Sequence, residues 1–222
     1  MKQNKSFLVI GITGGAGSGK TTVVEKIKEF VATEFIHCDV IAHELMEPGG
    51  ASYYALIKEY GKEILEGATE GAKISREKLA KVALASQKRA KRLNAITHPL
   101  VKQKVEERLQ ELDGKSFCGI AVIEAALLIE AGYQGMCDEL WYVQAPLEER
   151  VARMKENRGY TEEKIAGILK AQLSEEEFLR HADFVVQNPN LNDEELNEYL
   201  MRQIAPHLKE KLESRGMICY NK

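Results

Sequence analysis

A glycine-rich stretch near the start of the chain constrains the possible folds more than any other part of the sequence. It is preceded by residues 7–12, which are almost all apolar and typical of a buried strand in a parallel sheet. The stretch itself reads Gly14-Gly15-Ala16-Gly17-Ser18-Gly19-Lys20-Thr21 and fits the pattern G-x-x-x-x-G-K-[ST]. Val23, Val24 and Ile27 then follow at helical spacing. Strand, glycine loop and helix together predict an α/β fold built around a phosphate-binding loop.

The residue types of this loop suit the binding of nucleotide phosphates. Backbone N–H groups have to converge on the phosphate oxygens, and glycines leave room for that approach and allow unusual backbone angles. The helix adds the positive end of its dipole, Lys20 would reach the β- and γ-phosphates, and the hydroxyl of Thr21 would bind Mg²⁺. A glycine-rich turn with a solvated lysine is the alternative, which the flanking strand and helix disfavour. The predicted nucleotide-binding residues are Gly14, Gly15, Ala16, Gly17, Ser18, Gly19, Lys20, Thr21 and Thr22.

Composition and charge argue against several classes of protein. The net charge of −3 gives no basic field that would attract nucleic acid or a membrane surface. The longest apolar run, 120–129, contains Glu124 and is too short to span a bilayer. The four cysteines are scattered, which suits reduced thiols in a cytosol better than a disulfide framework or a zinc site. We therefore expect a cytoplasmic protein that has neither a nucleic acid nor a membrane as its partner.

Two acidic residues follow the predicted strands at the edge where ligands collect. Residues 35–39 read as a short second strand that ends at Asp39, and 117–124 read as a third strand that ends at Glu124. Asp39 could accept a proton from an attacking hydroxyl or help to place Mg²⁺, or it could cap a helix, and these interpretations are compatible. Glu124 could hold Mg²⁺ through water or accept a hydrogen bond from a substrate, or it could be a carboxylate favoured by a helix dipole.

The middle of the chain predicts a helical insertion. Residues 51–112 lack strand-like runs and read as successive helices, with a break at Thr97-His98-Pro99 because the residue before a proline avoids helical angles. So many helical residues between two strands exceed a simple crossover and indicate a substrate-side subdomain. A basic cluster in it is either a solvated helix face or part of a pocket for an anionic substrate. The cluster comprises Lys81, Lys88, Arg89, Lys91 and Arg92.

Two later helices predict a lid. One starts at Pro146, the other spans 161–172, and a glycine break at Gly159 separates them. Their arginines could close over a transferring phosphoryl group or could be ordinary surface residues. The arginines are Arg150, Arg153 and Arg158.

The last part of the chain completes the predicted sheet. Residues 138–144 and 182–187 read as its fourth and fifth strands. The chain then turns at Asn188, which would lie beside the phosphate loop at the sheet edge, where a nucleotide base could rest. Asn192 and Glu195 predict a capped helix that ends the fold.

Taken together, these stretches resemble the dephospho-CoA kinase family over nearly the whole chain. The phosphate loop alone is shared by many nucleotide-binding proteins, but the order of the later stretches is much more selective. The matching stretches are Ile10 to Thr22, Cys38 to Leu45 with Glu47-Pro48-Gly49, Leu93 to Val101, Leu127 to Glu130, Arg153 to Arg158, and Ala182 to Asn188.

This resemblance implies a P-loop kinase fold with a five-stranded parallel sheet, a helical substrate-binding insertion and a helical lid. The implied nucleotide-binding core covers 1–43, 113–148 and 178–222, the implied CoA-binding insertion covers 44–112, and the implied lid covers 149–177. The implied reaction transfers the γ-phosphoryl group of ATP to the 3′-hydroxyl of dephospho-CoA with the help of Mg²⁺. This reaction is the last step of coenzyme A synthesis.

The resemblance also implies roles for single residues. Asp39 matches the proposed general base of the family, and Lys20 and Thr21 match its phosphate and Mg²⁺ ligands. The catalytic lid contact corresponds to Arg153 or Arg158.

Two positions depart from the pattern of the family. His37 stands where the family usually has a second aspartate, and Ala126 stands where it usually has a proline. The first departure could alter the orientation of Asp39 or the binding of Mg²⁺. Two alternatives therefore stay open, namely another P-loop kinase of the nucleoside monophosphate type and a regulatory protein that binds ATP without turnover.

Overall fold

The computed structural model describes residues 5–69, 71–125 and 127–217, and the chain divides into two compact units. The first unit combines both ends of the chain, up to Ile36 and from Leu112 onward, and the second is the continuous segment His37–Glu111. Each unit has its own hydrophobic core. Ala126, and Cys219 as one of the four cysteines, lie outside the described residues.

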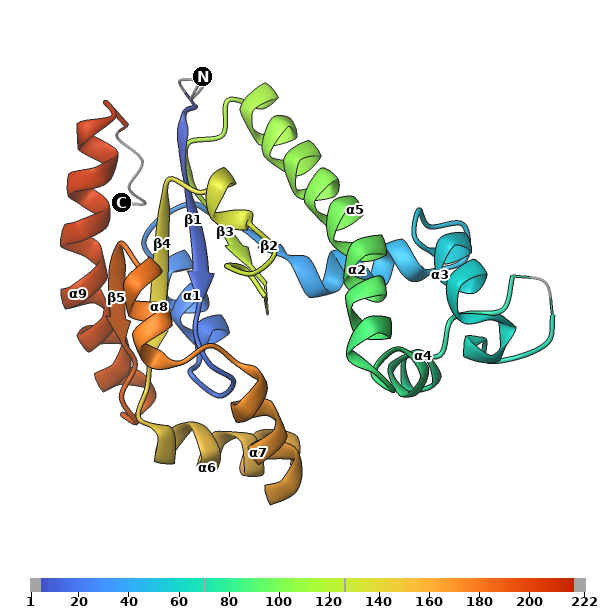
Figure 1. Ribbon diagram of the computed structural model, residues 1–222. Helices are drawn as coiled ribbons and strands as arrows, with labels where there is room; N and C mark the ends of the chain where they lie inside the picture. Colours follow the sequence, from blue (N-terminus) through green and yellow to red (C-terminus); the bar gives the residue numbers. More distant parts are fainter. Residues whose placement is uncertain (1–4, 70, 126, 218–222) are drawn as a thin grey trace. The chain divides into compact units, whose positions relative to one another are not determined.

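A five-stranded parallel sheet forms the centre of the first unit (Figure 1). The strands lie in the order β2-β3-β1-β4-β5, with β1 paired to both β3 and β4. Strands β1, β3 and β4 are almost completely buried, which explains their continuous apolar runs. The bounds are β1 Phe7–Thr13, β2 Thr33–His37, β3 Gly119–Glu124, β4 Glu139–Gln144 and β5 Phe184–Gln187. The predicted α/β fold class is confirmed.

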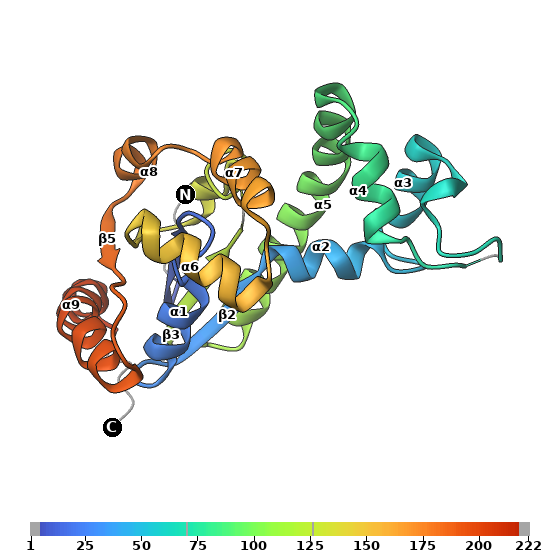
Figure 2. The same cartoon turned by 90° about the horizontal axis from the view of Figure 1, so that it is seen from below.

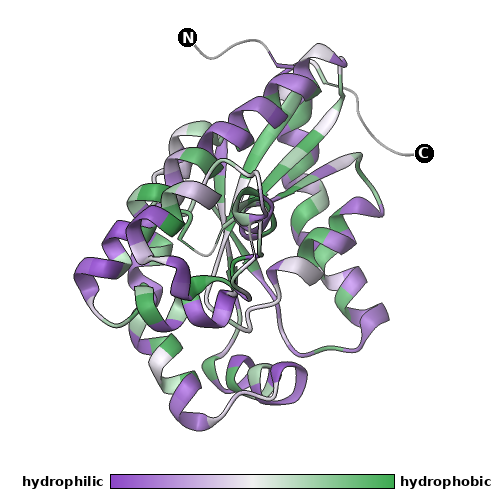
Figure 3. Ribbon diagram, turned by 90° about the vertical axis from the view of Figure 1, so that its right-hand side faces the viewer, coloured by the Kyte–Doolittle hydropathy of each residue, from purple (hydrophilic) through white to green (hydrophobic). Residues whose placement is uncertain are grey.

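Two helices, α1 (Lys20–Lys28) and α9 (Asp193–Ser214), pack through apolar side chains onto the same core as the strands. Along α9 the buried positions recur every fourth residue, so they form one stripe on the helix. Burial of each such leucine or isoleucine stabilises the fold by roughly 1.5–3 kcal/mol. In Figure 3 the strands are mostly green, which marks hydrophobic residues, whereas purple hydrophilic residues lie on the helices. The buried residues of α9 are Leu196, Leu200, Ile204, Leu208 and Leu212.

A third helix, α8 (Glu175–His181), contacts β4, and its Phe178 ring stacks on Tyr142 at a centroid distance of 5.0 Å. Figure 2 shows β5 between α8 and α9, so helices flank this edge of the sheet on both sides. The predicted capping box of Ser174 and Glu177 starts α8. The capping box of Asn192 and Glu195 likewise starts α9, as predicted.

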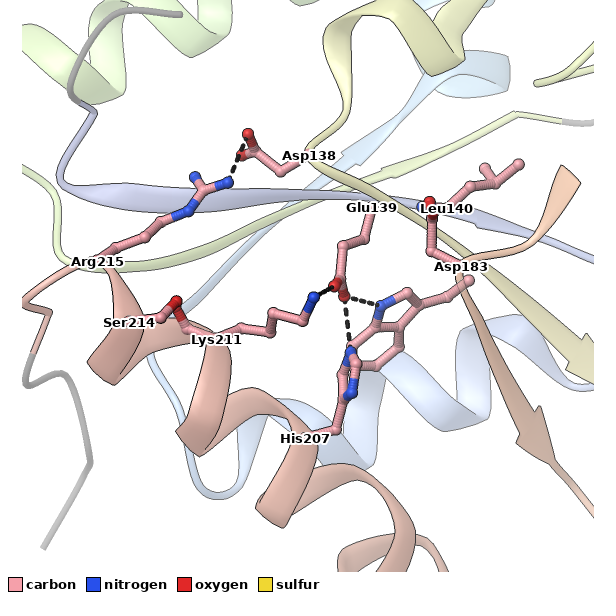
Figure 4. A network of polar contacts seen from close by, with 9 residues as sticks. Asp138, Glu139, Leu140, Asp183, His207, Lys211, Ser214 and Arg215 are labelled. Atoms are coloured by element: carbon pink, nitrogen blue, oxygen red, sulfur yellow. Dashed lines mark hydrogen bonds and ion pairs between the residues drawn. The ribbon is translucent and has the colours of Figure 1, made fainter.

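A buried carboxylate joins α9 to the start of β4 (Figure 4). Glu139 is only 5% exposed and accepts hydrogen bonds from Trp141 Nε1 at 2.9 Å and from His207 Nε2 at 2.7 Å. Lys211 Nζ completes the network at 2.6 Å. Burial favours the protonated acid, but the contacts with Lys211, Trp141 and His207 outweigh it and hold the pKa of Glu139 below its usual value.

The segment predicted as a lid contains α6 (Leu147–Arg158) and α7 (Glu162–Ala171). Gly159 ends α6 in the left-handed conformation, with a φ of 58°, and the Thr161 hydroxyl caps α7. A short 3₁₀ helix, η2 (Tyr133–Met136), precedes β4. The predicted glycine break between the two helices is therefore confirmed.

The second unit consists of helices. Its core gathers Tyr53, Leu56, Tyr60, Ile64, Leu65, Ile74, Leu79 and Ala83. Two tyrosine hydroxyls of this core donate to backbone carbonyls, Tyr53 to Ala72 and Tyr60 to Arg89. The elements are α2 Cys38–Met46, α3 Tyr53–Tyr60, the 3₁₀ helix η1 Lys62–Ile64, α4 Arg76–Ala83 and α5 Gln87–Gly114.

The predicted helix break before Pro99 is wrong, because α5 runs through this residue without interruption. A proline inside a helix costs about 3 kcal/mol. Burial of Val101, Val105 and Leu109 on one side of the helix beyond it offsets that cost. In the turn before the proline, the Thr97 hydroxyl donates to the carbonyl of Leu93, four residues earlier in the same helix.

Two further expectations need correction. The second strand ends at His37 and not at Asp39, because Cys38 already begins α2. Cys118 is disulfide-bonded, whereas Cys38 and Cys137 form no disulfide, so the expectation of reduced thiols is wrong for Cys118. Among the described residues, none of the helices is long and apolar enough to cross a membrane.

Candidate active site

The glycine loop connects β1 to α1 at the carboxyl edge of the sheet. Gly17 and Gly19 have φ angles of 78° and 83°, in the left-handed region that residues with a side chain rarely adopt. Gly19 is the N-cap of α1, and no side-chain hydrogen bond caps this helix. A glycine has no side chain that could cap the first N–H groups of α1, and the positive end of the helix dipole lies at the loop, where it favours an anion.

Close approaches explain why the loop is rich in glycine. A Cβ atom on Gly15 would lie 2.0 Å from Arg150 Nη2, and one on Gly17 would lie 2.4 Å from the backbone oxygen of Arg150. A Cβ atom on Gly19 would lie 2.2 Å from Asn188 Nδ2. Side chains at these three positions would displace the groups that surround the loop. The shape of the loop therefore depends on glycine at these positions.

Lys20 folds back over the loop that precedes it. Its Nζ donates to the carbonyl oxygen of Gly14 at 3.0 Å and to that of Gly15 at 3.5 Å. The ammonium group therefore lies directly above the backbone that would hold the phosphates. The predicted contact of Lys20 with the β- and γ-phosphates stays a prediction.

Asn188 and Arg153 hold the second half of the loop. Asn188 is 2% exposed, and its Nδ2 donates to the carbonyl oxygen of Ser18 at 2.7 Å. Arg153 Nη1 lies 3.3 Å from the Gly17 oxygen, and its Nη2 donates to the Asn188 oxygen at 3.4 Å and to Glu149 at 3.2 Å. The prediction that Asn188 lies beside the loop is consistent with these contacts.

Of the two arginines proposed for catalysis, the structure brings Arg153 to the loop. Arg158 is exposed at the end of α6, and its guanidinium lies over the ring of Tyr160, 5.9 Å from the centroid. A cation in this exposed position adds little to stability, since such contacts are worth about 0.5–1 kcal/mol.

One contact at the first half of the loop was not predicted from the sequence. Gln172, directly after α7, accepts hydrogen bonds on Oε1 from the Ala16 N–H and from Arg150 Nη2, both at 3.1 Å. Arg150 Nε also donates to the Ala16 oxygen at 3.0 Å. Burial lowers the pKa of Arg150 from its usual value, but a guanidinium remains charged at neutral pH. A lone glutamine after a helix carries no sequence signal that could have identified this contact.

The two candidate acids belong to different units. Glu124 is half-buried at the end of β3, in register with Ile12 of β1, so it lies at the sheet edge from which the loop departs. Asp39 is exposed in the first turn of α2, in the second unit, two residues after β2 ends. A carboxylate is favourable at that point of the helix dipole.

The loop fits a nucleotide triphosphate, and its surroundings fit Mg²⁺. Among the described residues no three His, Cys, Asp or Glu side chains gather into a metal site. Mg²⁺ does not require such a cluster, because it binds one or two protein oxygens together with substrate phosphates and water. Thr21, which is exposed at the start of α1, and Glu124 offer such oxygens. The buried Ser18 Oγ has no hydrogen-bond partner among the residues that the structure describes, so the loop retains an unused polar group.

The parallel sheet, the glycine loop and the basic residues around it define a P-loop kinase. A shikimate kinase from Bacteroides thetaiotaomicron shares this fold, with a TM-score of 0.52, 14% identity and coverage of 93% of this chain and 98% of that chain. A dephospho-CoA kinase from Campylobacter jejuni has the same fold, with a TM-score of 0.66, 23% identity and coverage of 91% and 98%.

More specific comparisons identify the family. A sequence model of the dephospho-CoA kinases matches residues 8–194. A dephospho-CoA kinase from Carboxydothermus hydrogenoformans is 34% identical over 180 residues, which cover 81% of this chain and 85% of the relative. One from Thermobifida fusca is 33% identical over 210 residues, which cover 94% and 100%. The chain belongs to the dephospho-CoA kinase family, as the resemblance of its motifs predicts.

Proposed function

We propose that this chain transfers the γ-phosphoryl group of ATP to the ribose 3′-hydroxyl of dephospho-CoA and releases CoA and ADP. One observation carries the phosphoryl-transfer part of the proposal. Lys20, Arg150 and Arg153 place three cationic groups in hydrogen-bond contact with the backbone of one glycine loop. The acceptor is supported by membership of the dephospho-CoA kinase family.

The proposed reaction needs little covalent work from the protein. The 3′-oxygen forms a bond to the γ-phosphorus, the bond from this phosphorus to the β–γ bridging oxygen breaks, and the hydroxyl proton leaves the acceptor. The loop N–H groups and Lys20 hold the phosphates in place and stabilise the negative charge on their oxygens. Asp39 accepts the hydroxyl proton and orients the acceptor.

Mg²⁺, held by the Thr21 hydroxyl and through water by Glu124, would neutralise negative charge on the phosphates. We assign the nucleotide to the loop with Thr22 and Asn188, and the acceptor to the helical insertion, 44–112. The lid, 149–177, would carry Arg153 to the transferring group. Arg158 is a weaker candidate for that contact, because the structure pairs it with Tyr160.

An acceptor profile tests this function. ADP release from Mg-ATP is measured with dephospho-CoA, AMP, CMP and a simple sugar alcohol, and the phosphorylated position of the product is determined by NMR. We expect turnover with dephospho-CoA alone and phosphate on the 3′-oxygen. A Lys20→Met variant is the control for contaminating kinases.

Other outcomes would contradict the proposal in different ways. Turnover of AMP or CMP in place of dephospho-CoA would make the protein a nucleotide kinase. Binding of ATP without turnover of any acceptor would make it a regulatory protein, in which His37 has replaced a residue that the chemistry requires.

A further inference from the structure

We propose that Gln172 is a positioning residue, which holds the Arg150 guanidinium at the phosphate loop and thereby couples the end of the lid to phosphoryl transfer. This inference rests on the proposed function, since it concerns a residue of the same site. The Gln172 side-chain amide is half-buried and accepts hydrogen bonds from two N–H groups.

The orientation of the Gln172 side chain is fixed by its neighbours. The Ala16 backbone and Arg150 can only donate at this point, so the amide has to present its oxygen to both. A carbonyl oxygen has two lone pairs, and the two contacts use both of them. Gln172 therefore has a defined orientation that a merely solvated glutamine would lack.

The same contacts fix the guanidinium. Arg150 Nε donates to the Ala16 oxygen while Nη2 donates to Gln172, so Ala16, Gln172 and Arg150 close a triangle of three hydrogen bonds. Among the described residues, these are the hydrogen-bond partners of the guanidinium. An arginine has five N–H donors, and the remaining ones are available to an anionic ligand.

The guanidinium lies against the part of the loop where side chains are missing. The place that a Gly15 Cβ would take is 2.0 Å from Arg150 Nη2. A half-buried cation beside the loop interacts more strongly with a phosphate held there than an exposed cation would, because water screens it less. Arg150 is therefore placed to contact the phosphoryl group that moves.

The neutral amide suits this role better than a carboxylate would. Glutamate could accept the same two hydrogen bonds, but its charge would neutralise Arg150 and repel phosphate. Glutamine orients the cation and leaves its charge available. The residue thus acts through Arg150, without contact of its own with the substrates.

Four variants test the inference, namely Gln172→Leu, Gln172→Glu, Arg150→Ala and the double variant Arg150→Ala/Gln172→Leu. Steady-state kinetics give kcat and both KM values, and equilibrium titrations give the Kd of ATP and of ADP. Gln134→Glu is the matched control, because Gln134 is exposed in η2, outside the residues assigned to the site. Thermal melts show whether each variant is folded at the assay temperature.

We expect Gln172→Leu to lower kcat by about 10-fold to 100-fold with the KM of dephospho-CoA changed by less than about threefold. In Arg150→Ala, the preference for ATP over ADP should fall by about tenfold, because the contact of Arg150 with the phosphate is lost. The double variant should have the same kcat as Arg150→Ala alone, because Gln172 acts through Arg150. Gln172→Glu should reduce ATP affinity, and the control should match the wild type.

Two results would overturn the inference. One is a folded Gln172→Leu enzyme with normal kcat and normal ATP preference. The other is a double variant in which the two losses multiply, since that would make the residues independent. The binding titrations need no acceptor, so they test Gln172 even where dephospho-CoA fails as a substrate and the proposed function fails with it.

Discussion

Lys211 Nζ lies 2.6 Å from Glu139 Oε1, so the last long helix holds a carboxylate that is buried at the start of β4. His207 and Trp141 also donate hydrogen bonds to this carboxylate. A buried charge with such partners is costly to leave half-paired. The network therefore adds a polar connection between α9 and β4 to the apolar packing of this helix on the sheet.

Glu139→Gln should lower the free energy of unfolding at pH 7 by about 2 kcal/mol, because the charge-assisted hydrogen bonds from Lys211 and His207 are weakened. The folded protein holds the pKa of Glu139 below its usual value of 4.5, so this stabilisation is present above that value. It is lost as the pH falls through the lower pKa of the folded state. Urea unfolding from pH 7 to pH 3 should show that the difference in unfolding free energy between variant and wild type narrows.

Glu198→Gln, which breaks an exposed pair with Arg202, is the control and should cost less than about 1 kcal/mol. A constant gap across this pH range would contradict the prediction.

Alanine at two glycines of the loop should have different consequences. At Gly15 the obstacle is the flexible end of Arg150, so the variant should remain folded while kcat falls about tenfold or more. At Gly17 the obstacle is the backbone of Arg150 and the φ angle is 78°, so stability should fall by about 1–3 kcal/mol as well. Gly167→Ala is the control, because open space surrounds Gly167 inside α7, and it should stabilise the helix by about 0.5–1 kcal/mol. Thermal melts and ADP release distinguish the three variants, and equal losses at Gly15 and Gly17 would count against this account.

Asp39→Asn should lower kcat by about 10²–10⁴-fold, since the amide cannot accept the proton of the attacking hydroxyl. The Kd of ATP should stay within about threefold of the wild type, because the change removes a transition-state interaction. Isothermal titration and initial rates provide the two numbers. Glu44→Gln is a control on the same helix. Turnover close to normal would remove Asp39 from its proposed role.

Arg153→Ala should reduce kcat/KM for ATP by about 10-fold to 100-fold, because the guanidinium bonds the backbone of Gly17 and Asn188. Arg158→Ala should change it by less than about threefold, since that cation is exposed and lies over the ring of Tyr160. The two variants are each other's control in one assay. A larger loss at Arg158 would show that closure of the lid exchanges the two arginines.

Local patterns were enough to predict the parts of the fold that local forces determine. The apolar run of 7–12, the glycine loop and the spacing of Val23 and Ile27 predict β1, the loop and α1, because strand and helix differ in their hydrophobic period. The two capping boxes were predictable for the same reason, since each satisfies backbone groups within four residues.

The sequence did not reveal contacts that depend on distant packing. Continuity of α5 through Pro99 depends on burial of residues one and more turns away, and local propensity gives the opposite answer. Gln172 reaches Ala16 across more than half the chain, so only the folded structure shows that the two meet. The motif does predict that Lys20 lies at the loop, because the pattern defines the structural context as well as the residue.

The first unit is made from both ends of the chain, and this has a consequence for synthesis on the ribosome. Strand β1 leaves the ribosome early, but its neighbours β3 and β4 and the covering helix α9 emerge much later. The continuous segment His37–Glu111 has its own core and can collapse while β1 still waits for partners. During that interval the edges of β1 are unpaired and exposed to aggregation, so truncation before α9 should be more harmful to the nascent chain than its position at the end suggests.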